Sequence, residues 1–513
     1  MGDEKLENID PFKDLRITPS VEYYWPGDLK RHFEKSIAKA LQDYRWDPVN
    51  NTEKVCKNGN LTASLRGAFC PLLTICKFED FATMRKPGYG ACTPPKKGDK
   101  NYKAYAFNSS ENLHNNMHDW CGGPVTKPDF HMASQMGHMA HVPLAAFDPI
   151  FWVHHSNVDR LIAIWQILHQ DSWFDQDSWF DQDSWFDQDS CDIRDEDMGT
   201  FAIDRYHPDK PSDPLRPFHK NGQGGYWTSA DAREITALGY TYPGLEKWNY
   251  VNADGSYDRA GHIKVLNNSL NLDYNAPWDA AQKAHLTGDP GERDGIKLAR
   301  MASLKGLTKQ DPVDLEIDDY VVNVIYEKFA LGGTSFTIHV FVGKVPDEHP
   351  STFQDQSTFV GQVFNFSTEP SSMGNSPSGC QNCRNQQEDR AESTGQVVLT
   401  NALITRFKNQ IPHEPEGDGP RTLASMKPED VVPFLKANFH WRVTSMGTLV
   451  EPERMPSLKV SVAVGKANHY ADRSKLSEFH DYKGAYEITE GRPGGAGSND
   501  GMYPPEDIYR SGT

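Results

Sequence analysis

Two histidines four residues apart, His114 and His118, constrain this chain more than any other feature of its sequence. On a helix, residues with this spacing lie on one face about one turn apart, so both imidazoles can reach one metal ion. A second segment, Asp148-Pro-Ile-Phe-Trp-Val-His-His-Ser-Asn-Val-Asp-Arg160, begins 30 residues after His118 and supplies further histidines. Imidazole suits copper, zinc, iron and nickel alike, so histidines alone do not identify the metal.

Both histidine segments carry the signals that begin a helix. Ser109 and Ser110 can cap a helix whose first turn contains Glu111, and both histidines follow. Asp148-Pro149 is a second start, because aspartate favours the N-cap and proline the first helical position. The sequence therefore predicts a metal site between two helices.

Length and charge limit the remaining interpretations. A chain of 513 residues is long enough for roughly two to four domains. The formal charge of −18 without a basic run predicts neither a nucleic acid nor a membrane surface as partner, and favours a small molecule. The charged N-terminus lacks the apolar core of a secretory signal, so we expect an intracellular, cytoplasmic protein.

The chain changes character along its length. The unit Gln-Asp-Ser-Trp-Phe-Asp recurs three times within residues 170–190, which we interpret as a duplicated loop segment rather than a dedicated acidic motif. Residues 251–318 are rich in loop-forming types and predict a linker. Alternating apolar residues at 336–342, 358–366 and 458–464 predict strands of a β-rich domain over 319–470. The glycine-rich residues 471–513 predict a disordered tail.

The two histidine segments together resemble a known motif. A His-x-x-x-His pair is weak by itself, and the zinc-protease version needs a glutamate where this chain has Asn115. With the segment 148–160, the pair resembles the second copper motif of tyrosinases, catechol oxidases and molluscan haemocyanins, the type-3 copper proteins. Further segments similar to fungal tyrosinases are Trp120-Cys-Gly-Gly123, Gly137-His-Met139, Val142-Pro-Leu-Ala-Ala-Phe-Asp148 and Gly239-Tyr-Thr-Tyr-Pro243.

This resemblance implies a fold and a ligand set. The fold would be a mainly α copper-binding domain, an incomplete helical bundle of tyrosinase or haemocyanin type, followed by the β-rich domain. Its core would span residues 106–250, with 1–105 as a divergent or truncated N-terminal part. The implied copper ligands are His114, His118 and His155.

Neighbouring residues would support those ligands. His154 would orient a ligand helix, paired with Asp159. Phe151 would stack on a ligand imidazole or simply fill the core. Glu111 and Asn115 would hold a water that deprotonates an incoming phenol, although Glu111 could equally cap its helix.

The C-terminal residues also resemble a domain of fungal tyrosinases. Tyr326-Glu-Lys-Phe-Ala-Leu-Gly-Gly333 and Leu399-Thr-Asn-Ala-Leu403 are similar to the β-domain that covers the copper site in that family until it is removed. Cys380 and Cys383 resemble a copper-handling pair, because soft thiolates suit Cu(I). The alternatives are a plain disulfide and two idle thiols.

The resemblance fails upstream of the second motif. A type-3 site holds two coppers on six histidines, whereas only His32 precedes His114. Three explanations stay open: a truncated or mis-spliced gene product, an inactive relative that binds one copper or none, and a partner chain that supplies the missing ligands.

By resemblance, the chain would be an oxidoreductase acting on small phenols with dioxygen. It would hydroxylate monophenols and oxidise o-diphenols to o-quinones, which lead to melanin. A copper-binding protein without activity and an oxygen carrier are the alternatives.

Overall fold

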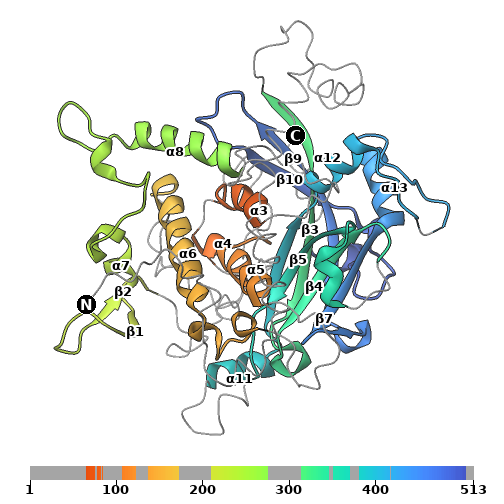
Figure 1. The fold of residues 1–513 in the computed structure, drawn as a ribbon, viewed down its shortest axis with the longest axis horizontal. Coiled ribbons are helices and arrows are strands. Elements are labelled where there is room, and N and C mark those ends of the chain that lie inside the picture. The colour runs from red at the N-terminus through yellow and green to blue at the C-terminus, as the bar shows by residue number, and fades with distance from the viewer. Residues whose placement is uncertain are drawn as a thin grey trace, which may run out of the picture.

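The computed structural model describes residues 65–75, 78–82, 84, 107–122, 137–170, 172, 210–274, 314–345, 350–369, 381–415 and 417–503. Its N-terminal half is helical, and its C-terminal half is built on two β-sheets (Figure 1). This confirms the predicted order of a helical domain followed by a β-rich domain. Among the described residues, no helix is both long and apolar enough to cross a bilayer.

Short helices and one long helix make up the helical domain. They are α3 (Leu65–Leu72), α4 (Phe78–Ala82), α5 (Ser110–Gly122), α6 (Pro149–Leu168), α7 (Ser229–Ala232) and α8 (Arg259–Tyr274), with a hairpin of β1 (Pro214–His219) and β2 (Tyr226–Thr228). Trp165 of α6 is the central packing residue. Its ring stacks on Phe81 of α4 with centroids 4.6 Å apart, and its indole nitrogen donates to the Ile75 carbonyl at 2.7 Å. The aromatic side chain thereby joins α6 to the segment that carries α3 and α4.

Two four-stranded sheets form the C-terminal domain. One has the order β10-β9-β3-β6 and the other β5-β4-β7-β8, and all neighbouring strands are antiparallel. The strands are β3 (Leu315–Glu327), β4 (Phe336–Val342), β5 (Phe359–Asn365), β6 (Glu392–Val398), β7 (Phe439–Ser445), β8 (Thr448–Val450), β9 (Lys459–His469) and β10 (Glu478–Gly484). The helices of this domain are α11 (Gln381–Glu388), α12 (Thr400–Asn409) and α13 (Pro428–Asn438).

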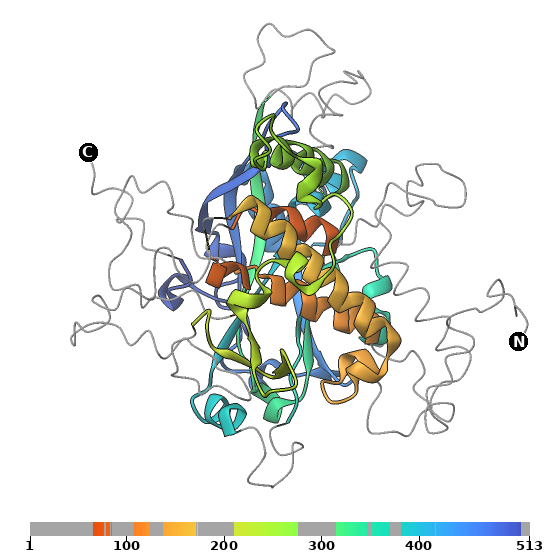
Figure 2. The same ribbon diagram turned by 90° about the vertical axis from the view of Figure 1, so that its left-hand side faces the viewer.

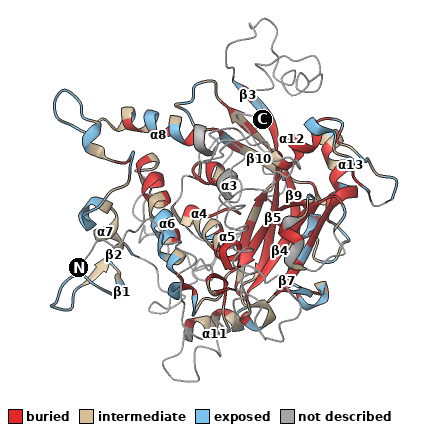
Figure 3. Cartoon of the chain, in the orientation of Figure 1, coloured by how far each residue is buried: buried red, intermediate tan, exposed pale blue. Residues whose placement is uncertain are grey.

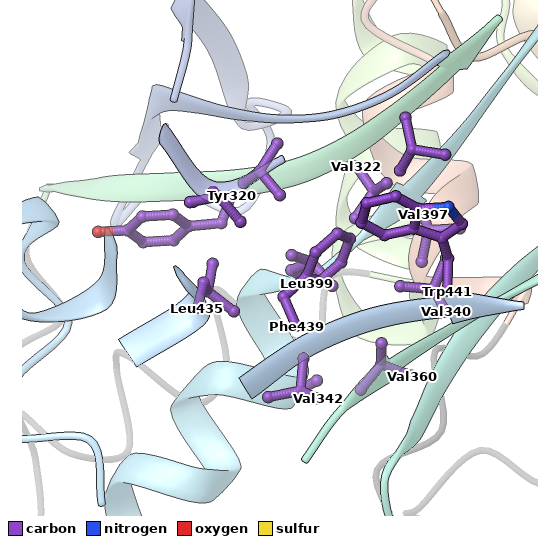
Figure 4. Packing of buried hydrophobic residues seen from close by; sticks show 14 of the residues in the cluster. Tyr320, Val322, Val340, Val342, Val360, Val397, Leu399, Leu435, Phe439 and Trp441 are labelled. Atoms are coloured by element: carbon purple, nitrogen blue, oxygen red, sulfur yellow. The ribbon is translucent and has the colours of Figure 1, made fainter. Parts of the chain in front are cut away.

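The largest apolar core lies between these sheets. Val322 of β3 and Val340 of β4 belong to one cluster with Leu435 of α13, which closes one side (Figure 4). Burial is concentrated here, whereas α7, the β1-β2 hairpin and the first half of α6 are largely half-buried or exposed (Figure 3). The strands expected at 336–342, 358–366 and 458–464 correspond to β4, β5 and the start of β9.

Two segments differ from the sequence-based expectation. The residues predicted as a loop-rich linker contain α8, and the residues predicted as a disordered tail contain β10. The glycines of the tail serve close packing: a Cβ at Gly495 would lie 2.0 Å from the Thr489 carbonyl oxygen, and Gly494 has a φ of +74°. Ordered chain continues to the buried Met502 and Tyr503. The prediction of a disordered tail is therefore wrong for residues 471–503, where the glycines permit close packing.

The two domains meet where α5 packs against β5. α5 also contacts α3, α6 and a 3₁₀ turn, η2 (His138–Ala140). In Figure 2, α6, α3 and α5 lie in front of the β-domain. α5 is thus shared by both domains, and it carries the first two histidines of the predicted site.

Candidate metal centre

α5 presents His114 and His118 on one face, as their spacing predicts. The helix begins with a serine cap, because the Ser109 hydroxyl accepts a hydrogen bond from the Asn112 amide at 3.1 Å. The two imidazole centroids are 4.6 Å apart. At its other end the helix packs tightly on η2, where a Cβ at Gly122 would lie 2.2 Å from the Ala140 nitrogen. Only glycine permits this approach, which brings η2 beside His118.

α6 supplies the third histidine. Asp148 is the N-cap and its carboxylate accepts from the Ile150 amide at 3.1 Å, with Pro149 at the first helical position. His155 lies two turns into the helix, and its Nδ1 contacts the Phe151 carbonyl at 2.8 Å. The predicted helix start therefore places His155 opposite the α5 histidines.

Three imidazole nitrogens converge between the helices. Nε2 of His114 lies 3.0 Å from Nε2 of His155 and 3.1 Å from Nε2 of His118. Two nitrogens bound tetrahedrally to one ion at about 2.0–2.1 Å would be roughly 3.3 Å apart. These two separations are close to that value, so His114 with His118, and His114 with His155, are each spaced like two ligands of one transition-metal ion.

The opposite ring nitrogens fix the orientation of each imidazole. Nδ1 of His118 lies 2.7 Å from the Met139 carbonyl, and Nδ1 of His114 lies 2.8 Å from Oδ1 of Asn115. Nδ1 of His155 faces the Phe151 carbonyl in the same way. Each of the three Nδ1 atoms therefore faces an acceptor and carries the proton. All three Nε2 lone pairs are left free to bind a cation.

Burial favours the neutral form of the two α5 imidazoles, His114 and His118. Desolvation, followed by the neighbouring His155, lowers the pKa of His114 to about 4. Desolvation and then His114 lower the pKa of His118 to about 3. Neutral imidazole is the form that binds a metal ion, so His114 and His118 are ready to bind a metal at neutral pH.

His154 is a fourth histidine at this place. One nitrogen each from His114, His118 and His154 lie within 4.8 Å of one another, so His154 could also reach a shared ion. Its ring, however, is nearly parallel to that of His114, at 18° and 5.0 Å, whereas the His155 ring crosses it at 71°. A lone pair lies in the plane of its ring, so the crossed pair converges on one point better than the stacked pair. The ring planes thus favour His155 as the third donor, whereas the group of donor atoms that all lie within 4.8 Å of one another contains His154 and not His155.

Two aromatic rings border the centre. Phe151 lies 3.9 Å from the His155 ring, centroid to centroid, so it does contact an imidazole of the candidate site. Phe366, just beyond β5, stacks on His118 at 4.0 Å and 18°. No sequence motif points to Phe366, because its contact with His118 depends on how the C-terminal domain packs.

The predicted water-holding pair is arranged differently from the expectation. Asn115 is buried and uses Oδ1 to hold His114, while its Nδ2 donates to Sδ of Met84 at 3.0 Å. Glu111 is exposed in the first turn of α5. Asn115 therefore supports a ligand ring, and its amide is already occupied by two partners.

Asp159 does not pair with His154. Five residues along a helix correspond to a rotation of about 140°, so the two side chains point in different directions. Asp159 instead accepts hydrogen bonds from Tyr240 at 2.8 Å and Tyr242 at 2.5 Å. Through these two hydrogen bonds, Asp159 holds the segment 239–243 against α6.

Asp119, next to His118, is fully buried. Its carboxylate accepts from Gln362 at 2.5 Å, Gln354 at 3.3 Å and Thr337 at 3.2 Å. Desolvation raises the pKa of this carboxyl to about 7, against the opposing effect of the donors. Asp119 therefore faces the C-terminal domain and is buried away from solvent.

The remaining sequence features lie partly outside the described residues. Cys383 is disulfide-bonded, which supports the disulfide alternative over a free thiol pair; Cys380 lies outside the described residues. So does nearly all of the hexamer repeat, together with His32 and most of residues 1–105.

Similarity to known proteins agrees with this geometry. The sequence matches the common central domain of tyrosinase over residues 10–168 and the tyrosinase C-terminal domain over residues 319–462. The chain belongs to the tyrosinase family. Tyrosinases are type-3 copper oxidoreductases, and the match to the central domain includes every histidine of the candidate site.

Individual tyrosinases cover most of this chain. It is 27% identical to tyrosinase of Neurospora crassa over 93% of this chain and 71% of the relative. It is 30% identical to tyrosinase of Aspergillus fumigatus over 91% of this chain and 66% of the relative. The structure of recombinant mushroom tyrosinase aligns with a TM-score of 0.50 at 19% identity, over 82% of this chain and 60% of that one, which shows a shared fold. The chain thus spans about two thirds of the length of these tyrosinases.

Proposed function

We propose that this chain binds one copper ion through His114, His118 and His155, and that the centre oxidises small phenols with dioxygen. The observation that carries the proposal is the close approach of the His118 and His155 Nε2 atoms to Nε2 of His114, each ring having its Nδ1 against an acceptor. Three imidazoles suit several metals, and membership of a copper enzyme family favours copper.

Copper, when bound, would supply the redox chemistry that joins phenol oxidation to the reduction of dioxygen. The protein's own part is to hold and orient. The Met139 and Phe151 carbonyls and the Asn115 side chain keep the three rings in one tautomer. Glu111, exposed one turn before His114, would accept the phenol proton, because a phenol with a pKa near 10 binds a cation well only as phenolate.

A second function has a specific observation in its favour. The sequence has one histidine before His114, so the six-histidine set of a two-copper centre is not recognisable in it. In addition, Phe366 stacks on His118 and closes one side of the site. A copper-binding protein without oxidase activity is therefore the alternative.

Metal analysis combined with oxygen uptake separates the two functions. The full chain, loaded anaerobically with Cu(I) and freed of excess metal, should retain one copper. His118→Ala should lose it, whereas His262→Ala, a buried histidine outside the site, should not. Oxygen consumption with a simple catechol, abolished in His118→Ala, would support the phenol oxidase. Copper retention without oxygen uptake would support the alternative, and no retained copper would refute both.

A further inference from the structure

Large apolar side chains that remain exposed are concentrated in the helical domain. Of the twelve among the described residues, eleven lie between positions 144 and 265, and one, Leu449, belongs to the C-terminal domain. This imbalance exists although the structure describes more residues of the C-terminal domain than of the helical domain. Soluble monomers rarely expose a large contiguous apolar patch, so the helical domain has a surface that is suited to contact with another molecule.

The start of α6 carries the most exposed of these side chains. Phe147 is 72% exposed, Val153 is 69% exposed and Trp152 is 62% exposed. α6 lies on the outer side of the helical domain, with α4 and α5 between it and the sheets (Figures 1 and 2). These three side chains are therefore on a part of the molecule that a second molecule can reach.

The segment that contains Tyr240 and Tyr242 extends this surface. The Tyr240 hydroxyl donates to Asp159 at 2.8 Å, and the Tyr242 hydroxyl donates to the Ser156 carbonyl at 2.9 Å, so the segment lies against α6. Tyr240 and Leu238 are themselves exposed. We call this surface the α6 patch, and its members are Phe147, Trp152, Val153, Leu238 and Tyr240.

The α6 patch adjoins the candidate metal centre. Trp152 and His155 are three residues apart on α6, so their side chains lie on the same face of the helix. The ring of Phe151 contacts both of them, with centroids 5.1 Å from Trp152 and 3.9 Å from His155. His155 is only half-buried. A molecule that docks on Trp152 therefore lies next to a candidate metal ligand.

The charge of this region favours a second copy of the chain over a charged partner. The whole chain has a formal charge of −18, yet residues 144–170 and 210–265 contain eight acidic and eight basic residues. A net charge of one sign keeps copies of a protein apart, and this region has none. Aromatic side chains without a surplus of charge are also typical of the centre of a protein interface. A partner of strong charge would gain no attraction here, whereas an identical neutral surface can approach.

The chemistry of the proposed function gives a reason for two copies to meet at this place. Reduction of dioxygen to the level of peroxide takes two electrons, whereas one Cu(I) ion supplies one. The three histidines of one chain are donors for one ion. Two such centres that lie close together would supply both electrons.

We propose that two copies of this chain dock through the α6 patch, so that their two single-ion centres lie next to each other. A twofold axis places the same patch of each copy against itself, which is the commonest arrangement in homodimers. Each copy then covers Phe147 and Trp152 of the other. The pairing does not depend on copper, whereas the joint centre rests on the proposed function.

The molar mass in solution tests the pairing. In size-exclusion chromatography with light scattering, the full chain without copper should have the mass of two chains at micromolar concentration. Val153→Glu places one carboxylate from each copy in the interface and should raise the dissociation constant about a hundredfold or more. Because Val153 is exposed, this change leaves the core of each copy intact.

Leu449→Glu is the matched control, because it introduces the same carboxylate at the exposed leucine of the C-terminal domain. This variant should have the dissociation constant of the native chain. A monomeric native chain, which would leave the α6 patch to another occupant, would overturn the proposal. So would an equal weakening of the dimer in the two variants.

Electron paramagnetic resonance of the chain loaded with Cu(II) tests whether the two centres are adjacent. Two Cu(II) ions that lie close together couple magnetically, which broadens or removes the signal of an isolated ion. We expect coupling in the native chain and in Leu449→Glu, and the signal of isolated ions in Val153→Glu. A dimer with the signal of isolated ions would overturn the joint centre. If the chain retains no copper, the proposed function and the joint centre both fail, while the molar mass still decides the pairing.

Discussion

Replacing Asn115 with leucine tests whether metal affinity depends on the orientation of His114. Leucine matches asparagine in size but cannot accept the hydrogen bond that Nδ1 of His114 makes with Oδ1 at 2.8 Å. The ring would lose about 0.5–1.5 kcal/mol of hydrogen bonding and gain freedom to rotate and to protonate Nε2 instead. We expect copper affinity to fall about 10- to 100-fold, or about 1.4–2.7 kcal/mol.

Competition with a chromogenic Cu(I) chelator under anaerobic conditions measures this affinity. Asn116→Leu is a matched control one residue further along α5, since Asn116 pairs with the Phe364 amide and not with a histidine. Its affinity should change less than about threefold. If the two variants lose affinity equally, or if Asn115→Leu loses none, the orientation of His114 does not determine binding.

Three further predictions concern stability and access. Burial lowers the pKa of the His339 imidazole to about 3, so the free energy of unfolding that the chain has above pH about 6.5 decreases as the pH falls. Between pH 8 and pH 4.5, the free energy of unfolding of His339→Gln, measured in urea, should decrease by about 2.7 kcal/mol less than that of the native chain. Identical decreases in the two proteins would contradict this. Phe366→Ala removes the ring stacked on His118 and should speed copper removal by a chelator in stopped-flow measurements, with an unchanged rate as the contrary result. Asp148→Ala removes the N-cap of α6 and should cost about 1 kcal/mol of unfolding free energy, whereas Asp148→Ser should largely retain it.

Local signals in the sequence were enough to predict the two helices of the site. Ser109 and Asp148 do cap α5 and α6, and the four-residue spacing does place His114 beside His118. The strands were also predictable, because alternation of apolar residues depends only on neighbours along the chain. Such features are determined within a few residues, so no knowledge of tertiary packing was needed.

Contacts between distant segments could not be predicted in the same way. The sequence motif suggests His154 as the partner of Asp159, but its partners are tyrosines more than 80 residues away. The glycines after residue 490 were interpreted as disorder, although at Gly495 they permit a close approach of backbone to backbone. In both cases the sequence identifies a residue with a particular structural role, whereas the group that this residue contacts is determined by the fold.

The contacts around α5 are the part of the site that is hardest to predict from the sequence. Eight of its residues are buried, and most of these are polar or histidine: Asn112, Asn115, Asn116, His118, Asp119, Trp120, Cys121 and Gly122. A polar sequence of this kind normally predicts an exposed helix. Here the polar groups have two different uses, because the histidine face meets the candidate metal site while Asn116 and Asp119 meet the C-terminal sheet. Since both uses require buried polar side chains, the amino-acid pattern alone does not distinguish the metal-facing side from the domain-facing side, and only the fold assigns Asp119 to the interface.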